Sequence, residues 1–233
     1  MKLPETVSRE DWTRARKELL EKEKAHDRAR DALSAQRRAL PMVKLDKPYA
    51  FDGPDGRVAL HELFGTHSQL IVYHFMFDPS WDEGCKSCSF LADNFDPSPV
   101  HLAARDVAFA VVSRAPLAKL QAFQNRMGWH FRWYSSFGSD FNTDFHVTFP
   151  PGDRTGEYNY TNQSFPMPEA PGLSVFLRDG NDVFHTYSTY SRGLDHLITT
   201  YNYLDLTPHG RDEGGLSYGM EWLRHHDRYK SNA

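Results

Sequence analysis

The sequence has only two cysteines among its 233 residues, so it cannot form the several disulfide bonds that stabilise a small secreted scaffold. It has no apolar run approaching the roughly 18 residues that a membrane span requires. Its net charge of −4 gives no attraction toward nucleic acid, and no Gly-rich phosphate loop follows any predicted strand. We therefore expect neither a membrane nor a nucleic acid as partner, and no organic cofactor.

The first residues, MKLPETVSREDW, also lack the apolar segment of a signal peptide, so we expect a cytoplasmic protein. In that reducing compartment two neighbouring cysteines favour catalysis or redox sensing over a structural disulfide. The length allows one well-packed domain with extensions.

The most informative stretch of the sequence joins a buried strand to the two cysteines. The run LIVYHFMF (residues 70–77) is apolar on both faces, which is typical of a central strand in a parallel sheet. A turn follows, and then Cys85 and Cys88 stand three residues apart where a helix can begin. The helix N-terminus stabilises a thiolate at Cys85, Lys86 adds a positive charge, and Cys88 can close a disulfide.

Other interpretations of the pair remain open. An inert pair would sit among aliphatic residues, whereas Gly84, Lys86 and Ser87 flank these cysteines. A zinc ribbon needs two further ligands at short regular spacing, and the sequence has no other cysteine. We favour redox chemistry, with Cys85 as a nucleophile whose pKa lies below about 8.5.

The rest of the chain predicts one α/β domain with two extensions. Residues 1–41 are expected as an N-terminal helical extension, 42–207 as the domain, and 208–233 as a C-terminal tail anchored by Trp222 and Leu223. Within the domain, strand, helix, strand and helix alternate through residues 70–128, which predicts a parallel βαβ unit. A short edge strand is expected within 129–135, and a hairpin at 173–190 followed by a helix completes the sheet.

The segment from about 136 to 171 has no clear period and is too long for a simple connection. It is rich in both aromatic and polar residues, a composition common at binding surfaces. We expect this insertion to shape a substrate groove rather than to contribute to the core.

The N-terminal segment, residues 8–39, carries a thin apolar stripe at helical spacing and alternating charges. A helix of this kind gains most of its stability by packing on a surface. That surface is either its own domain or a second copy of the chain, so a homodimer through this helix is a candidate.

The order of these elements resembles a thioredoxin fold, a mixed central sheet flanked by helices. The strings SQLIVYHFMFDPSWDEGCKSCSF, HLAARDVAFAVVSRAPLAKLQAFQNRMGW and FHTYSTYSRGLDHL resemble the family known as domain of unknown function 899. Members of that family are described as predicted dithiol–disulfide oxidoreductases. The resemblance extends over nearly the whole chain.

The resemblance implies a nucleophilic Cys85 and a resolving Cys88 that act on a protein or small-molecule disulfide or thiol. It implies supporting roles for Trp81, Lys86 and Pro171, the last near the place where thioredoxins carry a cis-proline. The sequence differs from thioredoxins in having Gly84-Cys-Lys-Ser-Cys instead of the usual aromatic-Cys-Gly-Pro-Cys.

Two further resemblances give alternative functions. The first is to peroxiredoxins, whose reactive cysteine lies in a motif similar to Pro-x-x-x-Thr/Ser-x-x-Cys. Here Asp82 stands in place of the hydroxyl residue, so a thiol peroxidase is the weaker alternative. Thioredoxin-like copper chaperones pair two cysteines with a distant histidine, which Cys85, Cys88 and His185 could mimic as a metal site without turnover. His74 is expected as a hydrogen-bonded core residue, and His146, His225 and His226 as solvated side chains.

Overall fold

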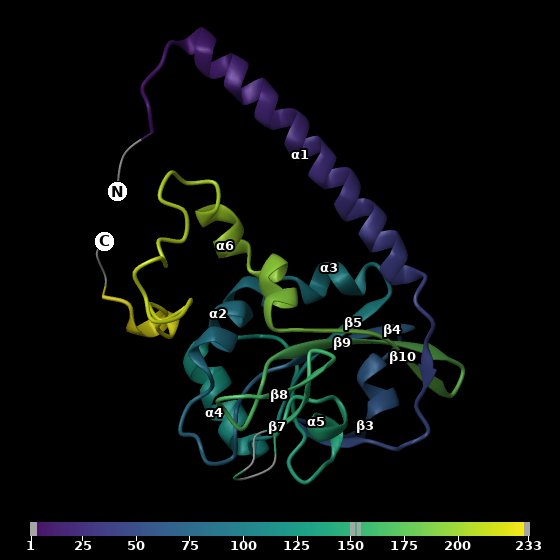
Figure 1. Ribbon diagram of the computed structural model, residues 1–233. Helices are drawn as coiled ribbons and strands as arrows, with labels where there is room; N and C mark the ends of the chain where they lie inside the picture. Colours follow the sequence, from purple (N-terminus) through teal and green to yellow (C-terminus); the bar gives the residue numbers. More distant parts are fainter. Residues whose placement is uncertain (1–3, 150–151, 153–154, 231–233) are drawn as a thin grey trace.

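The structure is a computed structural model that describes residues 4–149, 152 and 155–230 (Figure 1). Within these residues the centre is an eight-stranded mixed sheet, made of β1 (Val43–Lys44), β2 (Ala50–Gly53), β3 (Gly56–Ala59), β4 (Gln69–His74), β5 (Val107–Ser113), β6 (Trp133–Ser135), β9 (Gly172–Asp179) and β10 (Asp182–Tyr190). Their order across the sheet is β1-β10-β9-β4-β5-β6-β2-β3. A separate hairpin is formed by β7 (Thr155–Tyr158) and β8 (Thr161–Ser164).

The parallel part of the sheet is built from two βαβ units. Helices α2 (Lys86–Phe95) and α3 (Pro99–Ala103) connect β4 to β5, and α4 (Leu117–Met127) connects β5 to β6. β9 pairs antiparallel with β4 on one side and with β10 on the other. This arrangement is a thioredoxin-like fold, so the predicted fold class is confirmed.

The two faces of the sheet bury two separate cores. Helices α2, α4 and α6 (Thr199–Leu204), with the 3₁₀ helix η2 (Ser191–Leu197), cover the face that carries the cysteines, which we call the cysteine-side core. The 3₁₀ helix η1 (Leu60–Phe64) and the short α5 (Phe141–Asp144) cover the opposite face, the far-side core. Alternation along β4 sends Tyr73 to the cysteine side and Leu70 and Val72 to the far side.

The segment 136–171 contributes to the interior, so the expectation that it stays outside the core is wrong. Phe141 and Phe145 are buried in the far-side core, and Phe149 and Tyr158 pack with Tyr190 in a third cluster. Three aromatic residues that suggested a binding surface, Phe141, Phe145 and Tyr158, are instead buried, with the Phe141 and Phe145 ring centroids 4.6 Å apart. Phe137 and Tyr160 of the same segment are exposed. Residues 150–151 and 153–154 of this segment lie outside the described residues.

Two local expectations also need correction. β6 is not an edge strand, because Ser135 pairs with Asp52 of β2 and the β2–β3 hairpin extends the sheet beyond it. The predicted helix after the second hairpin is divided into η2 and α6 at Ile198, whose backbone leaves the helical region.

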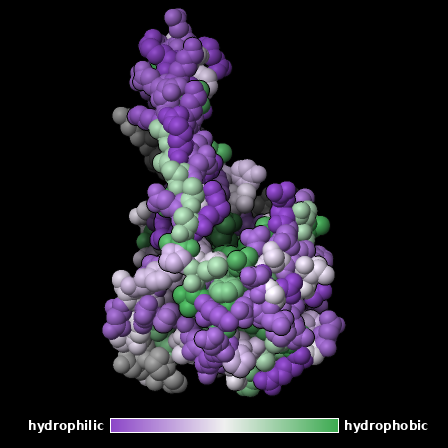
Figure 2. Space-filling view, turned by 90° about the vertical axis from the view of Figure 1, so that its right-hand side faces the viewer, coloured by the Kyte–Doolittle hydropathy of each residue, from purple (hydrophilic) through white to green (hydrophobic). Residues whose placement is uncertain are grey.

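The N-terminal helix α1 (Arg9–Arg38) has the bounds that its sequence predicts, and Ser8 caps it by accepting a hydrogen bond from the Asp11 N–H at 3.0 Å. It extends away from the domain and has no buried residue (Figure 1). Figure 2 shows apolar atoms along this helix and at its base. The exposed large apolar residues there are Trp12, Leu19, Leu20, Leu33, Leu40, Met42 and Val43.

The C-terminal tail returns to the cysteine side of the domain. Leu223 is fully buried in the cysteine-side core, and the Trp222 ring packs edge-on against Phe90 of α2 at 5.7 Å. Both predicted anchors therefore hold the tail. A short 3₁₀ turn, η3 (His226–Arg228), follows them.

Candidate active site: two thiols at the start of a helix

The buried strand β4 leads directly into the cysteine loop. Residues 75–77 leave the strand but stay buried, and the Phe75 N–H donates to the Val112 carbonyl at 2.9 Å. The chain turns at Asp78, whose side chain accepts hydrogen bonds from the Ser80 N–H and hydroxyl. It then returns so that the Cys85 N–H donates to the Met76 carbonyl at 3.1 Å. These contacts place Cys85 at the N-cap of α2.

Gly84 makes this return possible because it has no side chain. A Cβ at this position would lie 2.7 Å from the Phe75 ring and 2.8 Å from the Phe123 ring. Both rings are buried in the cysteine-side core and cannot move aside cheaply. The glycine therefore lets the loop pack directly on the core, one residue before the reactive position.

Cys85 has the properties of a nucleophile. Its side chain is half-buried, whereas that of Cys88 is 2 % exposed, and both are free thiols. A hydrogen bond from the Cys88 thiol is the largest influence on Cys85 and lowers its pKa to about 7, against the opposing effect of burial. The N–H groups of Cys88 and Ser87 and the Ser87 hydroxyl lower the pKa further. The helix start thus holds a sulfur that is about half ionised near neutral pH.

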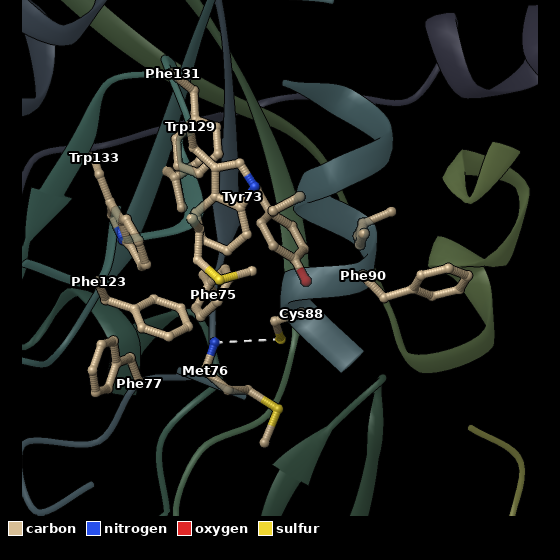
Figure 3. Packing of buried hydrophobic residues seen from close by; sticks show 14 of the residues in the cluster. Tyr73, Phe75, Met76, Phe77, Cys88, Phe90, Phe123, Trp129, Phe131 and Trp133 are labelled. Atoms are coloured by element: carbon tan, nitrogen blue, oxygen red, sulfur yellow. Dashed lines mark hydrogen bonds between the residues drawn. The ribbon is translucent and has the colours of Figure 1, made fainter. Parts of the chain in front are cut away.

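Cys88 is the opposite case. Burial raises its pKa well above the ordinary value, and the neighbouring Cys85 sulfur raises it further. Two hydrogen bonds act in the other direction and lower the pKa of Cys88. One comes from the Tyr73 phenol on β4, and the other from the Met76 N–H in the following loop, 3.5 Å from the Cys88 sulfur. Figure 3 shows the Cys88 sulfur facing Met76, with the Tyr73 hydroxyl close to α2 on the side of the strand. The pKa values of the two thiols are therefore shifted in opposite directions.

The three predicted supporting residues surround the loop in different ways. Trp81 packs against the cysteine-side core, and its carbonyl accepts a hydrogen bond from the Lys119 ammonium at 2.7 Å. The Lys86 ammonium donates to the Glu221 carbonyl of the tail at 3.0 Å. Pro171 lines a cavity together with Cys88, and its peptide bond is trans. Whether any of them supports the chemistry stays a prediction.

His185 does not join the cysteines, so the copper-type site of Cys85, Cys88 and His185 is not formed. Its ring lies on the far side of the sheet, 5.3 Å from the Phe145 ring, with Nε2 2.7 Å from the Ser188 hydroxyl. No group of three His, Cys, Asp or Glu side chains suited to a metal ion occurs among the described residues. The expectation failed because β10 presents this position to the opposite face from α2.

His74 is the buried, hydrogen-bonded residue that was expected. Its Nε2 lies 2.8 Å from the Ser174 hydroxyl, and burial lowers its pKa to about 3, so it is neutral. It faces the far-side core, stacked against Phe141 and Phe145.

His225 was expected to be solvated, and this expectation is wrong. The ring is 7 % exposed, and Nε2 donates to the Gly84 carbonyl at 2.9 Å. Nearby, Glu83 pairs with Arg126 of α4 at 2.6 Å and with Arg228 of the tail. The tail therefore holds the residues on both sides of Cys85, since Lys86 also bonds to it. A histidine in a polar tail carries no sequence signal for this contact.

A buried ionic cluster at the same end of the sheet was also missed. Arg114, which directly follows β5, places its guanidinium 2.6 Å from Asp78 and 2.5 Å from Glu169. Glu169 is fully buried, which raises its pKa to about 7, although Arg114 and the Thr148 hydroxyl oppose the shift. The two carboxylates, Asp78 and Glu169, are 36 and 55 residues from Arg114 in sequence, so no spacing pattern could have joined them.

The fold and the dithiol together define a thioredoxin-like protein with a Cys-x-x-Cys pair at the start of its first central helix. Similar solved structures include peroxiredoxin Q of Xanthomonas campestris, at 13% identity and a TM-score of 0.46 over 74% of this chain and 99% of that one. A candidate protein disulfide isomerase of Bacteroides thetaiotaomicron matches at 18% identity and a TM-score of 0.41, over 70% and 91% of the two chains. Similarity this low carries no argument about activity.

The chain belongs to the family described as "Bacterial protein of unknown function (DUF899)", whose model matches residues 1–229. The family resemblance found in the sequence is thus confirmed over the whole chain. None of the curated proteins matches it. Among the described residues, no helix is both long enough and apolar enough to cross a membrane.

Proposed function

We propose that this protein is a thiol–disulfide oxidoreductase in which Cys85 is the nucleophile and Cys88 the resolving thiol. The observation that carries the proposal is the opposite perturbation of two sulfurs in hydrogen-bond contact. Cys85 has a pKa lowered to about 7, and Cys88 has a pKa raised by burial. A structural disulfide or an inert core pair would gain nothing from this asymmetry.

The reaction follows from the two ionisation states. The Cys85 thiolate attacks one sulfur of a substrate disulfide, forms a mixed disulfide and releases the first thiolate. Cys88 then attacks the Cys85 sulfur, its proton passes to the second leaving thiolate, and an internal Cys85–Cys88 disulfide remains. The substrate disulfide is reduced to two thiols while the protein dithiol is oxidised, and a reductant must restore the dithiol for turnover. Reversal of the same steps would oxidise a substrate dithiol.

A redox sensor would use the same pair without turnover, so the decisive experiment measures both trapping and turnover. The Cys88→Ser variant should accumulate a mixed disulfide at Cys85 with its substrate, whereas the Cys85→Ser variant should not. The wild-type protein should reduce a model disulfide repeatedly when dithiothreitol is supplied. Trapping without turnover would favour the sensor, and the absence of both would reject the proposal. In the reducing cytoplasm that we propose as its location, the pair would rest as a dithiol.

A further inference from the structure

A cavity of about 230 Å³ opens beside Cys88, whose side chain forms part of its wall. The apolar part of the wall comes from β4 and its loop, α2, the η2–α6 region and the tail. It is formed by Tyr73, Met76, Leu91, Leu194, Ile198 and Met220. Pro171, at the entrance to β9, completes this side. Five separate segments of the chain therefore line the cavity and meet at the resolving cysteine.

The polar groups of the cavity carry no unbalanced charge. Asp195 is the one acidic side chain in its lining, and Arg211 holds both of its carboxylate oxygens at 2.9 Å. The Arg192 guanidinium lies 3.7 Å from the same carboxylate, with a side chain 84% exposed. The remaining polar groups are the hydroxyls of Tyr73, Ser87 and Ser191 and the Cys88 thiol. A charged substituent would lose its hydration here without gaining an unpaired counter-charge.

The size of the cavity limits what can enter it. Pockets that enclose a whole drug-sized ligand usually have volumes of about 300–1,000 Å³. At about 230 Å³ this one is suited to a single group of side-chain size. The rest of the substrate would remain outside, near the half-buried Cys85 sulfur.

We propose that this cavity binds the apolar substituent next to the sulfur that Cys85 attacks. The substrate class is then disulfides that carry an aliphatic or aromatic group beside the reacting sulfur, either in a peptide or in a small molecule. This inference rests on the proposed function, because it assigns a substrate class to the same dithiol. Burial of a group the size of a leucine or phenylalanine side chain is worth about ten- to a hundredfold in rate or affinity.

The electron balance is that of the exchange reaction itself. In the first step the Cys85 thiolate bonds to the sulfur that carries the apolar group, and the partner thiolate leaves. In the second step the Cys88 thiol displaces that sulfur from Cys85, and its proton goes to the departing apolar thiolate. The substrate disulfide is the oxidant of the protein dithiol, and no further reactant takes part.

A series of 2-pyridyl disulfides tests the assignment on the full-length reduced protein. The other substituent is benzyl, hexyl, hydroxyethyl or carboxyethyl, and release of 2-thiopyridone reports the first step. Each rate is divided by the rate of dithiothreitol with the same reagent, which removes intrinsic differences in reactivity. The benzyl and hexyl reagents should react about ten- to a hundredfold faster than the other two on this scale. Equal ratios across the series would overturn the inference.

A matched pair of variants locates the preference. Ile198→Phe should fill part of the cavity and lower the ratio of the benzyl and hexyl rates to the hydroxyethyl rate. Leu197→Phe alters the neighbouring residue, which packs on the same core but does not line the cavity, and should keep the preference. If Ile198→Phe fails to fold, the wild-type series alone decides.

Two peptide disulfides with Leu or Ser beside the half-cystine separate the possible sources of the apolar group. A preference for the leucine peptide points to protein substrates, and a preference confined to the small reagents points to small molecules. If the protein reacts with none of the disulfides faster than a free thiol of similar pKa, the proposed function itself fails. If it reacts with all of them at equal normalised rates, only the assigned substrate class fails.

Discussion

The imidazole Nε2 of His225 lies 2.9 Å from the carbonyl oxygen of Gly84, which is the residue immediately before Cys85. The two residues are 141 positions apart in sequence. A tail that sequence analysis describes only as an extension therefore supports the backbone of the reactive loop.

The His225→Ala variant should loosen the loop that carries Cys85. It leaves the buried Gly84 carbonyl without its partner, and such a loss is worth about 1–3 kcal/mol. Thermal unfolding should show a lower free energy of unfolding, and alkylation of Cys85 should show an altered rate. His101→Ala, on the exposed surface of α3, is the matched control. Unchanged stability and reactivity in His225→Ala would mean that the tail contact is incidental.

The rate of Cys85 alkylation should rise with pH around a midpoint of about 7. In the Cys88→Ala variant the midpoint should move up toward the free-thiol value of about 8.5, because the hydrogen bond from the Cys88 thiol is lost. Cys88→Ser is the matched control, since a hydroxyl can still donate and should keep part of the shift. A wild-type midpoint above 8 would contradict an activated Cys85.

The Tyr73→Phe variant should slow the second step of exchange and leave the first unchanged. The phenol hydrogen bond lowers the pKa of Cys88, so its loss makes the resolving thiol harder to ionise. We expect the mixed disulfide at Cys85 to persist about three- to tenfold longer, as for the loss of one hydrogen bond of about 1 kcal/mol. Quenched-flow mass spectrometry would measure its lifetime.

The pH dependence of Cys85 alkylation should be the same in Tyr73→Phe as in the wild type. If the variant slowed both steps of exchange, the substitution would have disturbed the core in general and not Cys88 specifically. Phe75→Leu, which changes packing in the same core without touching a polar group near Cys88, is the matched control.

The free energy of unfolding should fall as the pH rises from about 4.5 to about 7 through the effect of Glu169. Its pKa is raised by burial from 4.5 to about 7, so the folded state holds its proton more tightly than the unfolded state over this range. Stability from this group is thus complete below about pH 4.5 and is lost as the pH rises through 7. The difference amounts to up to about 3 kcal/mol.

The Glu169→Gln variant removes the titrating proton but keeps a polar side chain for Arg114 and Thr148. Its stability, measured by urea unfolding across the same pH range, should lack the decrease attributed to Glu169. Glu157→Gln, at an exposed position on β7, should behave as the wild type. If Glu169→Gln and the wild type show the same pH profile, the buried carboxyl does not titrate in this range.

We propose that helix α1 makes a contact between two copies of the chain. It has no buried residue, yet Trp12, Leu19 and Leu33 are each about half exposed along it. The double substitution Leu19→Glu and Leu33→Glu should convert a dimer to a monomer in multi-angle light scattering. Leu206→Glu alters an even more exposed leucine outside α1 and should leave the dimer intact. A wild-type monomer at all concentrations would rule out this role.

The sequence by itself determined the central frame of the protein. The apolar run at 70–77 is buried on both faces, and the spacing of Cys85 and Cys88 at the start of α2 was visible because all its parts are neighbours in the chain. The helix bounds of α1 and the hairpin of β9 and β10 followed from local capping and turn signals in the same way. Periodicity and spacing report local structure, and these features are local.

Only the tertiary structure decided which distant residues surround the thiols. Tyr73 and Met76 reach Cys88 because α2 packs over the end of β4, and His225 reaches Gly84 because the tail returns across α4. The same reasoning explains the wrong predictions: His185 lies on the opposite face of the sheet, and Phe141 and Phe145 of the 136–171 segment are buried in the far-side core. Such contacts depend on how faces and loops meet in space, and residue spacing along the chain carries no information about that.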